Sequence, residues 1–315
     1  MSGMMLGTLT IGQAPRSDIV PILEAHLPPG TACLHLGALD GLSKPEIAAR
    51  FTPRSGEAVL TTRLLDGSSV VLGKPAVRDM LQAKLAILEA KGCDLIALLC
   101  TGEFADLNCR RARLIEPDRL VPTTGLPAKL AEEQTQGATT QLQKAHAIYE
   151  YVFHTMKYDK SGTGWGHGDT LWACDSKRGN CTDFHSLFIS MARSQKIPAR
   201  FEIGFPLPAD KHSAEIAGYH CWSDFYVDSI GWIPVDISEA WKHPELHDYY
   251  FGAHDVNRMQ FTVGRDLRVS PPQAGAALNY FVYPYVEVEA KEYPNVSNAF
   301  SFQDDDAVAA TGASK

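Results

Sequence analysis

Residues 181–195, CTDFHSLFISMARSQ, predict a helix because their apolar side chains recur at helical spacing. Cys181 stands at the predicted start of this helix. A helix N-terminus carries partial positive charge, which lowers the pKa of a cysteine thiol and favours the reactive thiolate. The Cys181 amide also points out of the helix end, where it can donate a hydrogen bond to an oxyanion. Cys181 is therefore a candidate nucleophile and a candidate oxyanion donor.

The chain beyond this helix changes to the period-two pattern of strands. Three segments show the pattern: ARFEIGF at 199–205, YHCWSDFYV at 219–227 and GWIPVD at 231–236. A long helix is expected earlier, capped by Thr139 or Thr140, with one apolar stripe. That stripe consists of Leu142, Ala145, Tyr149, Val152 and Met156. The second half is therefore predicted to be α+β, with a helical layer followed by an antiparallel sheet.

A base for the thiol is expected on the second strand. Alternation places His220 on one face and Cys221 on the other, so we expect only His220 to face a cleft. A third group must hold the second imidazole nitrogen, and Asp236 at the end of the next strand can do so. We expect a register that sets Asp236 directly opposite His220, or a bulge that restores it. Asp224 is a weaker rival and is expected to be solvated.

Three separated blocks now resemble a known family. GNCTDFHSLFISMARSQKIPARFEIGFPLP, GYHCWSDFYV and GWIPVDISEAW are similar to the signature blocks of the bacterial transglutaminase-like superfamily, whose core has the papain-like cysteine protease arrangement. The resemblance covers residues 139–290. It implies that Cys181 is the nucleophile, His220 the base and Asp236 the residue that orients the base. It also implies thiol-dependent acyl chemistry on amide bonds of peptides or proteins, through a thioester acyl-enzyme.

Water and amines compete for such an acyl-enzyme, and a groove that excludes water is needed to favour the amine. The sequence shows no such groove, so hydrolysis by a peptidase or amidase is expected first. Transfer of a glutamine acyl group to an amine and a non-catalytic peptide-binding module are the alternatives. Trp172 and Trp222 are candidates for the wall of the acyl cleft.

A structural zinc site is an alternative use of the same cluster. Its possible ligands are Cys174, Cys181, His185, His220 and Cys221. Structural zinc usually takes cysteine pairs two to four residues apart, and Cys174 and Cys181 are farther apart than that. We therefore expect no metal and no cofactor. His185 is expected to be a packing or hydrogen-bonded core residue.

The first part of the chain alternates strands and helices, which predicts an α/β fold. Strands are expected at 4–11, 31–36 and 94–100, and a helix is expected to begin at Pro75. A hairpin is expected at Asp66–Gly67.

This part resembles AroM-like proteins, which are similar in turn to the aspartate/glutamate racemase superfamily. The blocks that carry the resemblance are LTIGQAPRSDIVPILEAHLP, LGALDGLSKPEIAARF, TTRLLDGSSVVLGKPAVRDML and GCDLIALLCTGEF. The resemblance implies that Cys100, followed by Thr101, occupies the place of a first racemase cysteine. The second lobe of such a fold is missing, and two-base proton transfer needs groups on both sides of the carbon. A lone Cys100 is therefore not expected to racemise an amino acid.

These patterns predict four segments: a truncated AroM-like domain at 1–122, a linker at 123–138, a transglutaminase-like domain at 139–290 and a disordered tail at 291–315. The first 122 residues contain 13 Lys plus Arg and 13 Asp plus Glu, so the whole net charge of −8 falls on the remainder. An acidic second half argues against nucleic acid as a partner and favours basic regions of a peptide or protein substrate.

The sequence shows no apolar stretch long enough for a membrane span and no secretory pattern at its start. We therefore expect a cytoplasmic protein without a membrane partner, although related transglutaminase-like domains are often exported. The incomplete first lobe is expected either to pack on the helices that follow or to self-associate through exposed apolar surface.

Overall fold

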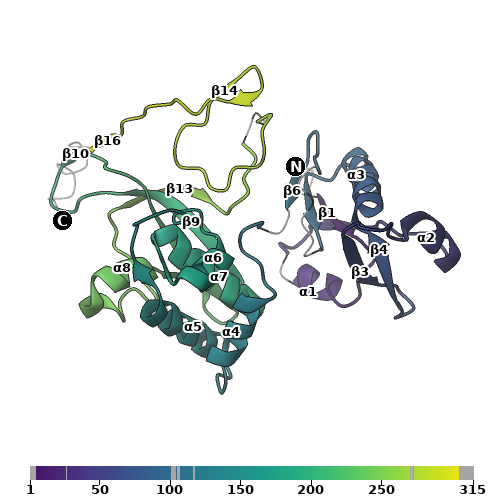
Figure 1. The fold of residues 1–315 in the computed structure, drawn as a ribbon, viewed down its shortest axis with the longest axis horizontal. Coiled ribbons are helices and arrows are strands. Elements are labelled where there is room, and N and C mark those ends of the chain that lie inside the picture. The colour runs from purple at the N-terminus through teal and green to yellow at the C-terminus, as the bar shows by residue number, and fades with distance from the viewer. Residues whose placement is uncertain are drawn as a thin grey trace. The chain divides into compact units, whose positions relative to one another are not determined.

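The computed structural model describes residues 5–25, 27–100, 104, 107–115, 118–269, 271 and 273–304. The chain divides into two compact units, Met1–Pro117 and Asp118–Lys315 (Figure 1).

The first unit is built on a parallel sheet with strand order β2-β1-β5-β6. Its elements are β1 Met5–Thr10, α1 Val20–Ala25, β2 Ala32–Gly37, α2 Lys44–Phe51, β3 Val59–Arg63, β4 Ser69–Gly73, α3 Lys74–Ala90, β5 Leu95–Leu98 and β6 Arg113–Ile115. The predicted hairpin forms between β3 and β4. The longest helix, α3, buries the side chains Val77, Leu81, Leu85 and Leu88 completely. The prediction of an α/β fold for this part of the chain is confirmed.

The second unit begins with helices α4 Leu126–Gln134, α5 Gln141–Thr155, α6 Thr170–Ser176 and α7 Cys181–Ser194. Thr140 caps α5, since its hydroxyl accepts a hydrogen bond from the Gln143 amide. Four members of the predicted stripe of α5 are buried, but Leu142 in the first turn is 38% exposed. Ile148 on the same helix is fully buried in its place.

A four-stranded antiparallel sheet follows, with strand order β12-β11-β9-β13. Its strands are β9 Ala199–Pro206, β11 His220–Val227, β12 Gly231–Val235 and β13 Arg258–Val263, and the short helices α8 Ile237–Lys242 and η1 Pro244–Leu246 follow β12. The three predicted strands are thus confirmed. The remaining short strands are β7 Lys157–Tyr158, β8 Arg178–Gly179, β10 Ser213–Glu215, β14 Glu287–Val288, β15 Lys291–Glu292 and β16 Ser301–Gln303.

Helix α7 is the centre of this unit. It packs against β9 and β11 on one side and against α4, α5 and α6 on the others. Every residue from Cys181 to Ala192 is buried, so α7 has no solvent-exposed face over this length. Its polar side chains bond internally; Ser186, for example, donates to the Thr182 carbonyl at 2.7 Å. Burial on all sides fixes the start of α7 relative to the sheet.

Three segments differ from the sequence predictions. The expected linker at 123–138 contains α4, which packs on α7 through the buried Ala131. No helix was predicted in the glycine-rich segment 159–180, but the structure has α6 there, with its N-terminus capped by the Asp169 carboxylate. A helix of about two turns within a glycine-rich stretch is too short to be recognised from periodicity.

The tail is the third difference. Within the expected disordered segment, β16 pairs antiparallel with β10. Phe300, directly before β16, anchors this segment, because the centroid of its ring lies 4.6 Å from that of Phe205. Residues 305–315 lie outside the described residues. Within the part of the chain that is described, no helix is both long and apolar enough to cross a lipid bilayer.

A glycine in the central strand gives a stability test. A Cβ added at Gly204 would lie 1.9 Å from the carbonyl oxygen of Met259 on the neighbouring strand, whereas one added at Gly218 meets nothing closer than 3.7 Å. We expect Gly204→Ala to lower the free energy of unfolding by about 1–3 kcal/mol, as overpacking does. Gly218→Ala is the matched control and is expected to change it by less than about 0.5 kcal/mol. Urea denaturation measures both, and equal effects would contradict the contact.

Candidate active site

The start of α7 is fixed by its capping residue. The side-chain oxygen of Asn180 accepts a hydrogen bond from the Thr182 amide at 2.9 Å, and its NH2 group donates to the Tyr219 hydroxyl at 3.0 Å. Cys181 is the first residue of the helix and is 2% exposed. Its amide has no acceptor within the helix, because the first amides of any helix lack one. This amide is thus available to an oxyanion.

A buried carboxylate fixes the glycine-rich loop beside the helix. Asp183 accepts hydrogen bonds from the amides of Gly166 at 2.7 Å, Gly168 at 2.9 Å and Asn180 at 2.9 Å. Burial is the largest influence on Asp183 and raises the pKa of its carboxyl, while the three amides act to lower it. The sequence analysis did not identify this role, although Asn180 and Asp183 have the spacing of a capping box.

His220 and Asp236 contact each other directly. The His220 Nε2 lies 2.6 Å from Asp236 Oδ2, and both side chains are buried. The expected register is wrong, since Ser223 pairs with Val235, which aligns Asp236 with Trp222 and not with His220. No bulge restores the expected pairing, because the partners run without a shift along β11 and β12. The contact forms nevertheless because Asp236 lies beyond the strand end, at the N-cap of α8.

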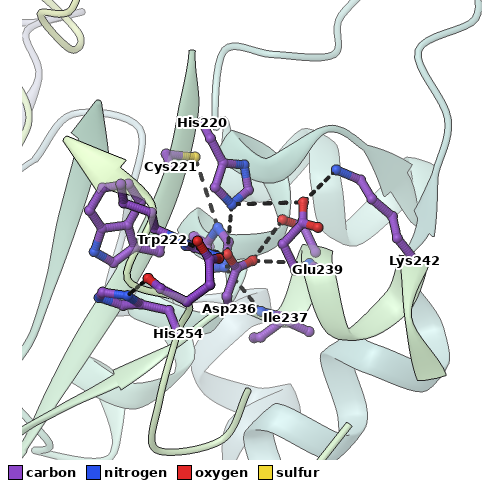
Figure 2. A network of polar contacts seen from close by, with 12 residues as sticks. His220, Cys221, Trp222, Asp236, Ile237, Glu239, Lys242 and His254 are labelled. Carbon is purple, nitrogen blue, oxygen red and sulfur yellow. Dashed lines mark hydrogen bonds and ion pairs between the residues drawn. The ribbon is translucent and has the colours of Figure 1, made fainter. Parts of the chain in front are cut away.

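This contact determines which imidazole nitrogen is available for proton transfer. With Nε2 directed at the carboxylate, Nδ1 is the nitrogen that remains for the thiol. His220 lies near enough to Cys181 to lower the pKa of the thiol, and Cys181 in turn acts to raise the pKa of His220. Figure 2 shows the imidazole directed toward Asp236, with Glu239 near the same ring nitrogen. The Oε1 of Glu239 lies 3.9 Å from His220 Nε2 and 2.6 Å from Lys242 Nζ.

Asp236 has further partners that hold it in place. Arg258 on β13 donates from Nη1 to Asp236 Oδ2 at 2.6 Å, and the Arg258 side chain is 3% exposed. The other oxygen, Oδ1, accepts from the Ser238 hydroxyl and from the Glu239 amide, each at 3.0 Å. The contribution of Arg258 could not be predicted from the sequence. Arg258 follows Asp236 by 22 positions and lies on another strand, so no short-range sequence pattern links the two residues.

His185 on α7 contacts the start of α8 next to Asp236. It is a hydrogen-bonded core residue, as expected. It is fully buried, and its Nε2 accepts from the Ile237 amide at 3.2 Å. Its Nε2 is therefore unprotonated, and in the neutral ring the proton resides on Nδ1. Burial lowers the pKa of His185 in spite of the Asp236 carboxylate nearby.

The charges favour an ion pair between sulfur and imidazole. A hydrogen bond from Cys221 has the largest effect on Cys181 and lowers the pKa of its thiol well below the usual value; the His220 bond and charge act likewise, while burial opposes them. Burial acts to lower the pKa of His220, but Asp236 and Cys181 outweigh it and raise that pKa to about 10. Burial also acts to raise the pKa of Asp236, but His220 and Arg258 hold it well below its usual range. A thiolate beside an imidazolium follows.

Cys221 belongs to this site, contrary to the expectation that it points away. Its Sγ lies 3.7 Å from the Thr182 hydroxyl and 3.9 Å from His185 Nδ1, so it faces the first turn of α7. The alternation of side chains along β11 was predicted correctly. The expectation for Cys221 was wrong because α7 packs on the face of β11 that carries Cys221 and places Cys181 near it.

Of the cleft candidates, Trp222 lies beside the site, with its ring centroid 6.2 Å from that of His220. Trp222 is buried, and its indole N–H donates to Glu202 at 2.9 Å, so it supplies no donor to a cleft. The Arg178 guanidinium lies 5.6 Å from the Trp172 ring. Asp224 is not solvated as expected, because it is 7% exposed and pairs with Arg200 at 2.7 Å.

The zinc alternative has no ligand set that fits. Among the described residues, no group of three or more His, Cys, Asp or Glu side chains has the arrangement needed to hold a metal ion. Burial raises the pKa of the Cys174 thiol to about 11. A protonated thiol is a poor zinc ligand.

The candidate site of the first unit is described only in part, since Thr101 lies outside the described residues. Cys100 is partly buried. The hydrogen bond to Asp18 is the largest influence on Arg16 and raises the pKa of its guanidinium, and Cys100 adds a smaller effect in the same direction. The loop that carries Arg16 is held by Asp40, which accepts from the amides of Ala14 at 2.7 Å and Gly37 at 2.6 Å.

Comparison with known proteins agrees with both resemblances. Residues 6–158 match the family model described as AroM protein, and residues 128–237 match the transglutaminase-like superfamily. The chain is thus similar to AroM proteins over its first half and to the transglutaminase-like superfamily over the segment that follows, and the two matches overlap at 128–158.

Individual proteins are similar to this chain with sequence identities below 30%. An uncharacterized protein of Haemophilus influenzae is 28% identical over a stretch that covers 53% of this chain and 54% of that protein. The chain thus spans about half the length of this curated relative. Among solved structures, a proposed cysteine protease of Cytophaga hutchinsonii is 19% identical, with 47% of this chain and 52% of that chain covered and a TM-score of 0.34. The periplasmic domain of TgpA from Pseudomonas aeruginosa is 21% identical, with 38% and 44% covered and a TM-score of 0.27.

The ion pair predicts an unusual pH dependence of alkylation. Because the Cys181 pKa is lowered, its thiolate persists on the acid side of neutrality, and iodoacetamide should label Cys181 rapidly at about pH 6. The rate should stay nearly constant until His220 loses its proton near its pKa of about 10. Cys174, with a pKa of about 11, is the internal control and should react only at alkaline pH.

His220→Ala should move the midpoint of the Cys181 rate to higher pH, because it removes a partner that lowers the thiol pKa. Peptide mapping by mass spectrometry measures both sites. A wild-type midpoint near the ordinary thiol value of about 8.5 would refute the ion pair.

Proposed function

We propose that the second unit is a cysteine hydrolase that cleaves amide bonds of peptides or proteins, with Cys181, His220 and Asp236 as its catalytic triad. The 2.6 Å contact between His220 and Asp236, beside a thiol at a helix start, is the observation that carries the proposal. The match of residues 128–237 to the transglutaminase-like superfamily supports thiol-dependent acyl chemistry in general.

The first half of the reaction forms a thioester. The Cys181 thiolate attacks the amide carbonyl carbon, and the negative charge that develops on the oxygen is stabilised by the Cys181 amide and the positive end of α7. The His220 imidazolium then gives its Nδ1 proton to the leaving amine, and the C–N bond breaks. Asp236 keeps the ring in the correct orientation and stabilises its positive charge throughout.

The second half releases the acyl group. Neutral His220 accepts a proton from water, whose oxygen attacks the thioester carbonyl, and the Cys181 thiolate leaves. A primary amine in place of water would give transfer. Hydrolysis is the first choice because transfer needs an acceptor groove that excludes water.

The substrate is proposed to be basic near the scissile bond. The net charge of −8 lies beyond residue 122, and an acidic field raises the local concentration of cationic ligands. Peptide and isopeptide substrates with lysine on either side of the bond are therefore the first to test.

A substrate screen with variants tests the triad. Cys181→Ala should abolish turnover, and Asp236→Asn should lower kcat by about 10²- to 10⁴-fold, because it removes the charge that orients and stabilises the imidazolium. Asp248→Asn is the matched control, since that side chain is fully exposed and should leave kcat unchanged. Mass spectrometry of products, with and without a fluorescent primary amine, separates hydrolysis from transfer.

Product that contains the amine and no free acid would establish transfer in place of hydrolysis. Alkylation of Cys181 at neutral pH without turnover of any substrate in the screen would favour the non-catalytic peptide-binding module.

A further inference from the structure

A second thiol lies against the helix turn that carries Cys181. The Cys221 Sγ is 3.7 Å from the hydroxyl of Thr182, the residue after Cys181, and 3.9 Å from Nδ1 of His185, one turn further along α7. The Cys221 thiol is also close enough to the Cys181 sulfur to be the largest influence on the pKa of the Cys181 thiol, which it lowers. The two sulfurs therefore approach each other from β11 and α7.

The surroundings of Cys221 leave it no other role in amide chemistry. Its side chain is fully buried and lies on the face of β11 opposite Trp222. His185 does not deprotonate it, because the Nδ1 that faces Cys221 carries the proton of a neutral ring whose Nε2 already accepts from Ile237. Cys221 is thus a protonated thiol held beside a thiolate.

We propose that Cys221 is a resolving cysteine, which captures Cys181 as a reversible disulfide after Cys181 is oxidised by a hydroperoxide. A thiolate next to a second cysteine is the arrangement in which oxidation stops at a disulfide. The proposal goes beyond the hydrolase reaction and requires no amide turnover.

The oxidation proceeds in two balanced steps. The Cys181 thiolate attacks one oxygen of hydrogen peroxide, a S–O bond forms, the O–O bond breaks, and hydroxide leaves and takes up a proton as water. Cys221 sulfur then attacks the sulfur of the Cys181 sulfenic acid, a S–S bond forms and the S–O bond breaks. The departing hydroxide leaves with the Cys221 proton as a second water. The two thiols lose two electrons in total, and the peroxide gains them.

Disulfide formation would remove the nucleophile reversibly. A disulfide holds its sulfurs about 2.05 Å apart, so the bond draws the start of α7 and strand β11 together. Thiolate attack by a reductant restores both cysteines, whereas sulfinic and sulfonic acids formed on an unprotected thiolate are not restored by thiols. Cys221 therefore preserves a reactive sulfur that would otherwise be lost.

The test uses the full chain, reduced, desalted and exposed to hydrogen peroxide, in three forms: wild type, Cys221→Ser and Cys174→Ser. Cys174→Ser is the matched control, because Cys174 is a buried cysteine of the same unit that is placed outside the site. Remaining thiols are blocked with iodoacetamide, and peptides are mapped by mass spectrometry before and after treatment with dithiothreitol.

Wild type and Cys174→Ser should both give a linked peptide that contains Cys181 and Cys221, and dithiothreitol should restore alkylation of Cys181. In Cys221→Ser, oxidised Cys181 should be found as sulfinic or sulfonic acid, with loss of that recovery. Irreversible oxidation of Cys181 in wild type at the rate seen in Cys221→Ser, or a disulfide to another cysteine, would overturn the proposal. The wild-type peptide map decides even if Cys221→Ser fails to fold, and neither result depends on amide hydrolysis.

Discussion

The arrangement of the site depends on the carboxylate of Asp236 and the hydrogen bonds that it accepts. This carboxylate receives the imidazole of His220, the guanidinium of Arg258 and the Glu239 amide of α8, so two strands and a helix meet at one buried charge. A buried carboxylate is stable only when paired and hydrogen-bonded, and each partner here satisfies that requirement. Loss of any partner would therefore change the charge state of the imidazole as well as the local fold.

The opposite end of the site depends on α7, which is buried on all sides. Asn180 and Asp183 exchange hydrogen bonds across its first turn, and Asp183 also binds the amides of Gly166 and Gly168. The glycine-rich loop and the thiol are thus attached to the same turn of helix. This rigidity is what allows a thiol and an imidazole from distant parts of the chain to keep a fixed separation.

The local features of the chain could be predicted from the sequence, and the features that depend on packing could not. The start of α7 at Cys181 and the alternation of β11 follow from short-range patterns. The partners Arg258 and Cys221 do not, since the first comes from a distant strand and the second depends on which layer covers its face. The predicted register of β12 was wrong because the chain turns over residues 228–230, and strand alternation does not determine where this turn forms. The helix α4 was missed because Pro122, Gly125 and Pro127 interrupt its signal.

The place of Arg258 also bears on how the protein can be divided for study. The superfamily match ends at residue 237, one residue beyond Asp236, whereas the cation that neutralises this carboxylate lies on β13. A fragment trimmed to the matched range would retain Cys181, His220 and Asp236 and yet leave Asp236 without its arginine. Expression boundaries for the isolated second unit therefore belong after β13, not at the end of the recognisable motif.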